Sequence, residues 1–177
     1  MNHRIPWPAA LLAGAASAQT PVFEAGGDAA YYLFGKAVAL QLAGRFDEAG
    51  DQYRKILQKN PRSEDTLVNL IAVDMARKDS QRVRETAEQL LAVQPQSQAA
   101  LEGLAASAFA AGDNEAAARH CAKLVAIAPD HFEGWFNLGV AHQKVGRYQE
   151  AARAYVEAVR LHPESPQVHV NLGIVSQ

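Results

Sequence analysis

The sequence predicts an all-α protein built from a repeated pair of antiparallel helices, and three regularities support this. Prolines recur at a fixed interval of 34 residues, at Pro61, Pro95, Pro129 and Pro163. Glycines recur between the prolines with the same period. Small side chains also recur with this period, at two other positions of the repeat. A period of this length is typical of repeat proteins in which each unit buries its apolar face against the next.

Each unit should hold two helices, because proline is excluded from helix interiors and glycine ends a helix at little steric cost. Proline therefore marks the turn between units, and glycine marks the turn within a unit, at Gly44, Gly112 and Gly146. The expected helices span 30–43 and 47–59, 64–77 and 81–93, 98–111 and 115–127, 132–145 and 149–161, and a first helix alone in the partial unit 166–177. The four full units are 30–63, 64–97, 98–131 and 132–165.

Helix starts and packing positions follow the same period. Serines stand where the next first helix should be N-capped, and a proline occupies the favoured first helical position of the last one. These residues are Ser63, Ser97, Ser165 and Pro166. Small residues recur in one slot of the first helix and one slot of the second, so that helix axes can approach closely: Ala37, Ala105, Gly139 and Gly173, and Ala49, Ala117 and Ala151. A larger slot beside them holds Tyr53, Cys121 and Tyr155, so the lone cysteine should be buried and inert.

The fourth unit carries the most specific motif. Trp135, Leu138 and Gly139 form a W-x2-L-G pattern, which Ala151, Tyr155 and Pro163 follow in register. This stretch resembles the tetratricopeptide repeat family, and the resemblance covers about residues 30–177. The second unit departs most from the family pattern, with Asp74 in the tyrosine slot and Lys78 in place of glycine. Its inner turn is therefore expected to be looser than the others.

The resemblance implies a right-handed solenoid whose first helices line a concave groove for a peptide or protein partner. Helical geometry predicts which residues face that groove. The candidate binding residues are Tyr31, Phe34, Val38, Val68, Asn69, Met75, Glu102, Phe109, Glu133, Phe136, Asn137, Val140 and Asn171. The same face also carries Gln41, Asp65, Ala72, Ala99, Ala106, Gln143, Val170 and Ile174. The alternative for the alanines and valines is simple packing between neighbouring first helices.

Three asparagines share one slot of this face: Asn69, Asn137 and Asn171. In the family that the chain resembles, an asparagine there often holds the backbone of a bound peptide; the alternative is a solvated amide at the groove edge. Some family members hold a C-terminal carboxylate with a clamp of lysine, asparagine and arginine. The corresponding faces here carry acids and apolar residues, so no carboxylate clamp is expected.

The composition argues against several other classes of function. The net charge of −2 and the absence of a basic cluster disfavour nucleic-acid binding. The six histidines show no metal-ligand spacing, and Gly26-Gly27 is a linker pair rather than a phosphate loop. We find no catalytic constellation. The sequence therefore predicts a non-enzymatic protein without cofactor or metal.

The N-terminal 18 residues are expected to be a signal peptide. A short basic start precedes an apolar run, and Ala16-Ser17-Ala18 is an A-x-A site with cleavage before Gln19. The run is too short for an integral membrane span, and an uncleaved apolar N-terminus is the alternative. Residues 19–29 are expected to be a linker. The mature protein would be exported, to a periplasm or beyond the cell.

The last helix is expected to have an open side, formed by Val168, Leu172 and Val175. A solenoid needs a polar outer face on its final helix, so we favour a fragment of a longer protein, with self-association through this end as the other possibility. The leading hypothesis for function is an exported scaffold that binds a protein or peptide partner. The alternative is the N-terminal substrate-recognition region of a longer enzyme, which a catalytic motif after Gln177 would support.

Overall fold

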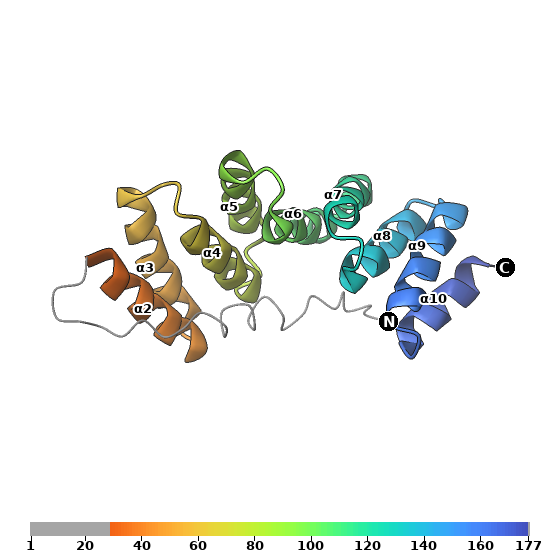
Figure 1. Cartoon of the computed structure of the whole chain (residues 1–177), viewed down its shortest axis with the longest axis horizontal. Helices are drawn as coiled ribbons and strands as arrows, with labels where there is room; N and C mark the ends of the chain where they lie inside the picture. Colours follow the sequence, from red (N-terminus) through yellow and green to blue (C-terminus); the bar gives the residue numbers. More distant parts are fainter. Residues whose placement is uncertain (1–28, 177) are drawn as a thin grey trace. The chain divides into compact units, whose positions relative to one another are not determined.

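The structure is a computed structural model that describes residues 29–176. Nine helices and no strands make up this part of the chain (Figure 1), which confirms the predicted all-α solenoid of helix pairs. The helices are α2 Ala29–Leu42, α3 Phe46–Lys59, α4 Glu64–Ala76, α5 Ser80–Val93, α6 Gln98–Ala110, α7 Asn114–Ile127, α8 Phe132–Lys144, α9 Tyr148–Leu161 and α10 Pro166–Val175. The expected signal peptide, and all of the expected linker except Ala29, lie outside the described residues.

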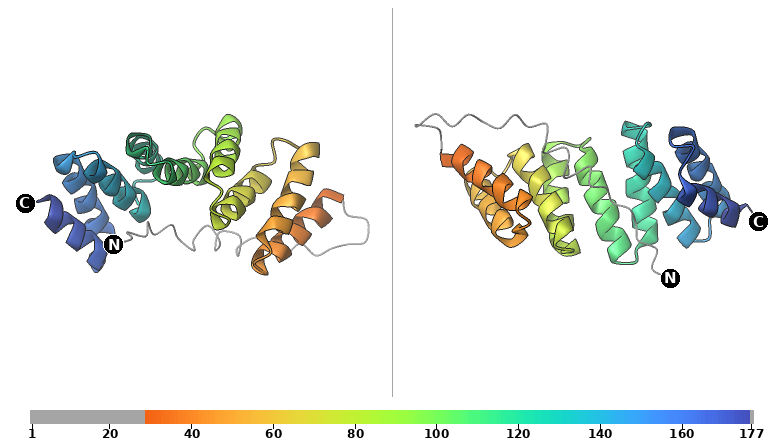
Figure 2. Two further views of the ribbon diagram at one scale, coloured as in Figure 1. Left: turned by 180° about the vertical axis from the view of Figure 1, so that it is seen from behind. Right: turned by 90° about the horizontal axis from the view of Figure 1, so that it is seen from below.

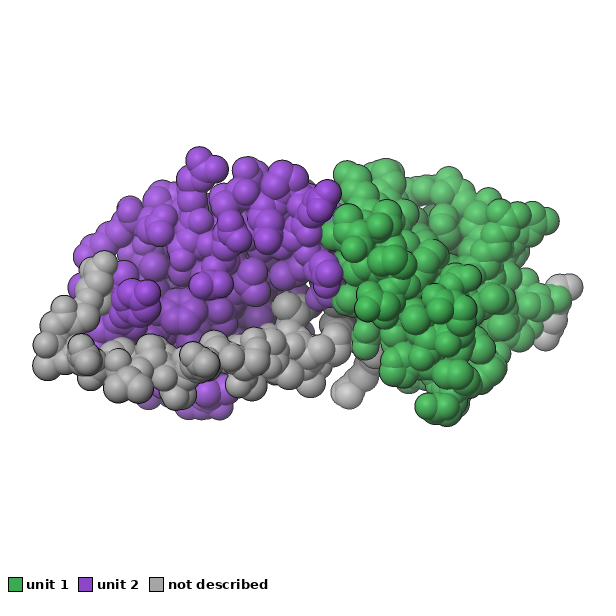
Figure 3. All heavy atoms as spheres, viewed as in Figure 1, with its two compact units in different colours: residues 1–7, 104–177 green, residues 8–103 purple. Residues whose placement is uncertain are grey.

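The described part of the chain divides into two units, residues 29–103 and residues 104–176 (Figure 3). The first, called here the N-terminal unit, contains α2 to α5 and the beginning of α6. The second, the C-terminal unit, contains the rest of α6 and α7 to α10. Consecutive helices run side by side in opposite directions within each unit, as α2 with α3 and α8 with α9 show (Figures 1 and 2).

The small-residue slots let the helices of a pair pack closely around one large ring. In the N-terminal unit, Ala37 and Ala49 are fully buried beside Tyr53, in a cluster with Leu70 and Val73 of α4. In the C-terminal unit, one cluster packs α6, α7 and α8 together and a second packs α8, α9 and α10. Cys121 is fully buried in the first of these, as predicted.

The turns within the pairs share one geometry. Gly44, Gly112 and Gly146 have φ of 73°, 75° and 78°, and Lys78 has φ of 60°. The Lys78 amide donates to Met75 O at 3.0 Å, just as the Gly44 amide donates to Gln41 O at 3.0 Å. The expectation of a looser turn in the second repeat, residues 64–97, is therefore wrong. The turn closes in the same way, and the lysine adopts a left-handed conformation that costs an L-residue about 1 kcal/mol relative to glycine.

The turns between the pairs are held by side chains. Trp135 Nε1 donates to Pro129 O at 2.9 Å. His169 Nε2 lies 2.6 Å from Pro163 O, at the equivalent point of the next turn. At the first of these turns the Pro61 carbonyl is bonded differently, since it accepts Gln89 Nε2 of α5 at 2.9 Å.

The predicted helix starts are confirmed only in part. Ser97 Oγ accepts the Ala100 amide at 3.3 Å, and Pro166 does open α10, but Ser63 and Ser165 make no capping bond. Two aspartates cap second helices instead. Asp113 accepts the amide of Ala116 at 2.8 Å, and Asp79 accepts the amide of Arg82 at 3.2 Å.

Candidate protein-binding surface

Of the seven predicted groove residues in the N-terminal unit, one is exposed, five are half-buried and one is buried. Tyr31 on α2 is 64% exposed, whereas Phe34 and Val38 are half-buried and pack against the core of this unit. The ring of Phe34 meets that of Tyr53 edge to face, with centroids 5.7 Å apart. Val68, Asn69 and Met75 on α4 are half-buried, and Glu102 on α6 is buried.

In the C-terminal unit the larger side chains predicted to face the groove are more deeply buried. Phe109 and Phe136 are buried, and Phe136 packs against Tyr155 with ring centroids 5.9 Å apart. Glu133, Val140 and Asn171 are half-buried. The structure thus buries the apolar rings of this face, Phe109 and Phe136, and leaves them little surface for a ligand.

A tyrosine hydroxyl fixes an amide on the groove face of each unit. Tyr53 Oη donates to Gln41 Oε1 at 2.9 Å in the N-terminal unit, and Tyr155 Oη donates to Gln143 Oε1 at 2.7 Å in the C-terminal unit. Asn171 also hydrogen-bonds the Tyr155 hydroxyl. Burial raises the pKa of Tyr155, and the bond to Asn171 opposes this effect. The hydroxyl therefore stays protonated at neutral pH and links α9 to α8 and α10.

Sequence reasoning missed this pairing, although a signal was present. A glutamine precedes the tyrosine by 12 residues in both units. The two pairs show that the groove-facing glutamines are held in a set orientation and are not free surface amides.

The three asparagines of the shared slot have different surroundings. The Asn69 nitrogen donates to Asp65 O, one turn earlier in its own helix, at 2.8 Å, and Asn171 is engaged with Tyr155. Asn137 is 1% exposed, and both its side-chain nitrogen and its side-chain oxygen lack a hydrogen-bond partner. A buried polar group without a partner costs about 1–3 kcal/mol, and such a group in a native structure calls for an explanation.

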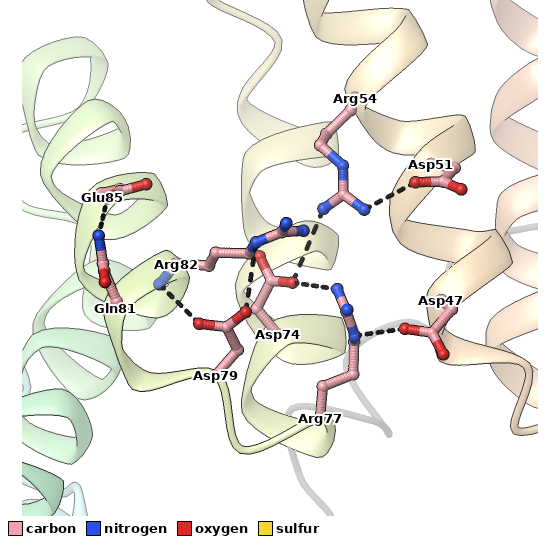
Figure 4. Close-up of polar contacts among 9 residues, drawn as sticks. All are labelled: Asp47, Asp51, Arg54, Asp74, Arg77, Asp79, Gln81, Arg82 and Glu85. Carbon is pink, nitrogen blue, oxygen red and sulfur yellow. Dashed lines mark hydrogen bonds and ion pairs between the residues drawn. The ribbon is translucent and has the colours of Figure 1, made fainter.

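A second polar feature lies at the contact of α3 and α4 (Figure 4). Asp74 is 1% exposed, and its Oδ1 lies 3.3 Å from Arg77 Nη1 and 3.8 Å from Arg54 Nη1. Each arginine also pairs with another carboxylate, Arg77 with Asp47 at 2.8 Å and Arg54 with Asp51 at 2.9 Å. Burial raises the pKa of the Asp74 carboxyl, and the arginines oppose this effect. The pairs join the first two repeats ionically, at the slot that the family fills with tyrosine.

The described part of the chain offers no group of three or more histidine, cysteine, aspartate or glutamate side chains that could hold a metal ion. His142 occupies the family's tyrosine slot in α8. Burial lowers its pKa, and Arg147 lowers it further. Among the described helices, none has the length and apolar character needed to cross a membrane.

Comparison with known proteins is consistent with this architecture. Three family models match the chain, over residues 9–64, 40–107 and 132–165, and each is described as a tetratricopeptide repeat. No protein of curated function matches the sequence.

Several solved structures have the same fold. MamA from Desulfovibrio magneticus RS-1 is 21% identical, with 86% of each chain covered and a TM-score of 0.80. Another MamA crystal structure is 19% identical over 82% of this chain and 80% of that one, with a TM-score of 0.79. A tetratricopeptide repeat protein from Parabacteroides merdae is 18% identical over 85% of this chain and 60% of that one, with a TM-score of 0.77.

Proposed function

The chain belongs to the tetratricopeptide repeat family, and we propose that it is a non-enzymatic scaffold that binds a peptide segment of a protein partner along the first helices. The observation that carries this proposal is the unpartnered amide of Asn137 in the C-terminal unit. Its nitrogen is a donor and its oxygen an acceptor, which match the carbonyl and the amide of an extended peptide. A helical ligand would not use them, because its backbone groups are already bonded internally.

The surroundings of Asn137 suit such a ligand. Glu133 and Val140 lie about one turn before and after Asn137 on the same face of α8, and both are half-buried. A ligand would reach the amide by displacing these two side chains. Gln143 and Asn171, both oriented by the Tyr155 hydroxyl, supply further amides nearby.

Selection from a displayed library of random peptides, with the full chain as bait, tests the proposal. We expect enriched peptides to bind the wild-type chain and to lose about 10-fold or more in affinity with Asn137→Leu, since two hydrogen bonds are removed. Leucine is close in shape to asparagine and removes a buried unpaired group, so the variant should remain folded.

Asn69→Leu is the matched control. It changes the equivalent residue of another repeat, whose nitrogen is already bonded within its own helix, and it should leave binding unchanged. Failure to enrich any peptide, or equal binding by wild type and Asn137→Leu, would refute the proposal.

We also propose that the protein is exported. The support is the apolar N-terminal run followed by Ala16-Ser17-Ala18. Expression of the full chain in a bacterium, followed by fractionation and N-terminal sequencing, should yield an exported product that begins at Gln19. A cytoplasmic product that retains Met1 would contradict this.

A further inference from the structure

One charged side chain, that of Glu133, stands beside the unpartnered amide of Asn137 on α8. Glu133 precedes Asn137 by four residues, so the two side chains lie on the same face of the helix, one turn apart. The Glu133 side chain is 32% exposed, whereas Asn137 is buried with its side-chain donor and acceptor both unpaired. A negatively charged acceptor at the surface therefore borders a buried amide.

No lysine or arginine of α8 lies near Glu133. Lys144 is the only such residue of this helix, and it is at the opposite end. His131 Nδ1 is 3.9 Å from Glu133 Oε2, but the same nitrogen accepts the Gly134 amide at 3.0 Å. A ring nitrogen that accepts a hydrogen bond carries no proton, so it meets the carboxylate as a neutral atom.

Helix α10 also brings no charge to this part of the C-terminal unit. Residues 166–175 contain no lysine, arginine, aspartate or glutamate. The side of α10 that the sequence predicted to be open is covered, since Val168 is fully buried and Leu172 and Val175 pack against the cluster of α8 and α9. The prediction of an open side is therefore wrong, because α9 lies against it.

Arginines that flank α9 are engaged with other carboxylates. Arg147 pairs with Glu115 at 2.8 Å, and Arg160 pairs with Glu157 at 2.8 Å. Glu133 makes no such pair with a lysine or arginine of the described residues. Its charge is therefore available to a ligand.

A comparison with α4 separates two roles for an acid at this position. Asp65 stands at the same position of its repeat and precedes Asn69 by four residues. Both acids are in the first turn of a helix, where the positive end of the helix dipole stabilises them. The Asn69 nitrogen is already bonded to Asp65 O, however, so only Glu133 borders an amide whose donor and acceptor are both unused.

We propose that the peptide bound at Asn137 carries a lysine or arginine whose side chain pairs with Glu133. The assignment rests on the proposed function, since it specifies the ligand of the same site. Residues four apart on a helix have Cβ atoms about 6 Å apart, and an extended chain advances about 3.3 Å per residue. The basic residue therefore stands about two positions from the residue whose backbone Asn137 holds.

Desolvation of Glu133 makes the basic residue a requirement of the site. A peptide at Asn137 moves the Glu133 side chain aside and removes water from its carboxylate. A charge that loses water without gaining a partner is costly, and a lysine or arginine supplies that partner through a charge-assisted hydrogen bond. Val140, on the other side of Asn137, is apolar and half-buried, so the charge is recognised at one end of the site.

Peptides enriched from the displayed random library with the full wild-type chain are the probes for this pairing. We expect them to share a lysine or arginine at one position and to bind more weakly as salt is added. In fluorescence anisotropy with a synthetic peptide, glutamine in place of the basic residue should weaken binding to the wild-type chain about 10-fold. The same replacement should change binding to Glu133→Gln by less than about 2-fold, because the pairing partner is gone.

Two further variants make the test specific to Glu133. Asp65→Asn is the matched control, since it removes an acid from the first turn of α4, and it should leave both the affinity and the effect of the basic residue unchanged. Glu133→Lys reverses the charge at the site. It should bind a peptide with glutamate in place of the basic residue more tightly than the wild-type chain does.

Two results would overturn the pairing while leaving the peptide site at Asn137 in place. One is a set of peptides that lose binding with Asn137→Leu but share no basic residue. The other is a basic residue whose replacement weakens binding to wild type and to Glu133→Gln equally. If no peptide is enriched, or if the enriched peptides bind Asn137→Leu as well as wild type, the peptide site itself is refuted and the pairing with it.

Discussion

Gly139→Ala is expected to destabilise the C-terminal unit, although alanine is the better helix former. The added Cβ would lie 2.5 Å from Cε1 and 2.6 Å from Cδ1 of Tyr155, closer than van der Waals contact permits. The ring has little freedom to retreat. It is fully buried, its centroid is 5.9 Å from that of Phe136, and its hydroxyl is bonded to Gln143 at 2.7 Å.

Two opposing contributions determine how much Gly139→Ala changes the free energy of unfolding. Alanine in place of glycine inside a helix gains about 1 kcal/mol, and overpacking a core by one methyl group costs about 1–3 kcal/mol. The pair α2 and α3 shows that an alanine can be accommodated beside the ring. There Ala37 and Tyr53, the equivalents of Gly139 and Tyr155, are both fully buried. The ring and α9 must nevertheless shift together from their present positions. The two contributions leave a net loss of about 0–2 kcal/mol in the free energy of unfolding, and we expect about 1–2 kcal/mol because the ring has little freedom to move.

The assay is urea unfolding followed by circular dichroism, with Gly173→Ala as the matched control. The control changes the same slot one repeat later, where the added Cβ meets nothing within 4 Å, so stability should be unchanged or raised by up to about 1 kcal/mol. If Gly139→Ala is as stable as Gly173→Ala, then contact with Tyr155 does not limit the size of this residue and the argument fails.

Three further changes test other parts of the structure. Lys78→Gly should raise the free energy of unfolding by about 1 kcal/mol, since it relieves a positive φ; an unchanged urea midpoint would contradict the strain. Asp113→Ala should lower it by about 1 kcal/mol, since it removes the N-cap of α7, and an effect below about 0.3 kcal/mol would show that the cap is dispensable. For Asp74 the prediction concerns pH. Burial raises the pKa of this carboxyl in the folded chain, so the stability that its proton confers is complete below the unfolded pKa and is lost as pH rises through the folded pKa. Asparagine is neutral at every pH, so the stability of Asp74→Asn relative to wild type should rise as the pH increases above about 4, the unfolded pKa of aspartate, and a constant difference would refute this.

Backbone hydrogen bonds explain why the inner turn of the second repeat has the same geometry as the others although it lacks the glycine. The Lys78 amide reaches Met75 O, and the Asp79 amide reaches Asp74 O, both at 3.0 Å. These bonds are formed by the backbone, which is the same for every residue, and packing of α4 against α5 fixes the path of the chain. The side chain at position 78 therefore changes the energy of the turn without changing its shape.

The sequence by itself determined the helix pairs, their order and the small and large packing slots. These follow from local rules: proline and glycine end helices, and a fixed period places equivalent side chains on equivalent faces. Ala49, Tyr53 and Cys121 were assigned to the interior in this way, and all three are fully buried.

Only the tertiary structure decided which side chains of a given face are free to bind. Asn69, Asn137 and Asn171 are alike in sequence position, yet one bonds its own helix, one has no partner and one meets a tyrosine from α9. Phe136 and Val170 are likewise equivalent, yet the first is covered by Tyr155 and the second is open. The physical reason is that a period fixes the direction of a side chain within its own helix, whereas hydrogen bonding and burial depend on atoms that neighbouring helices bring to it.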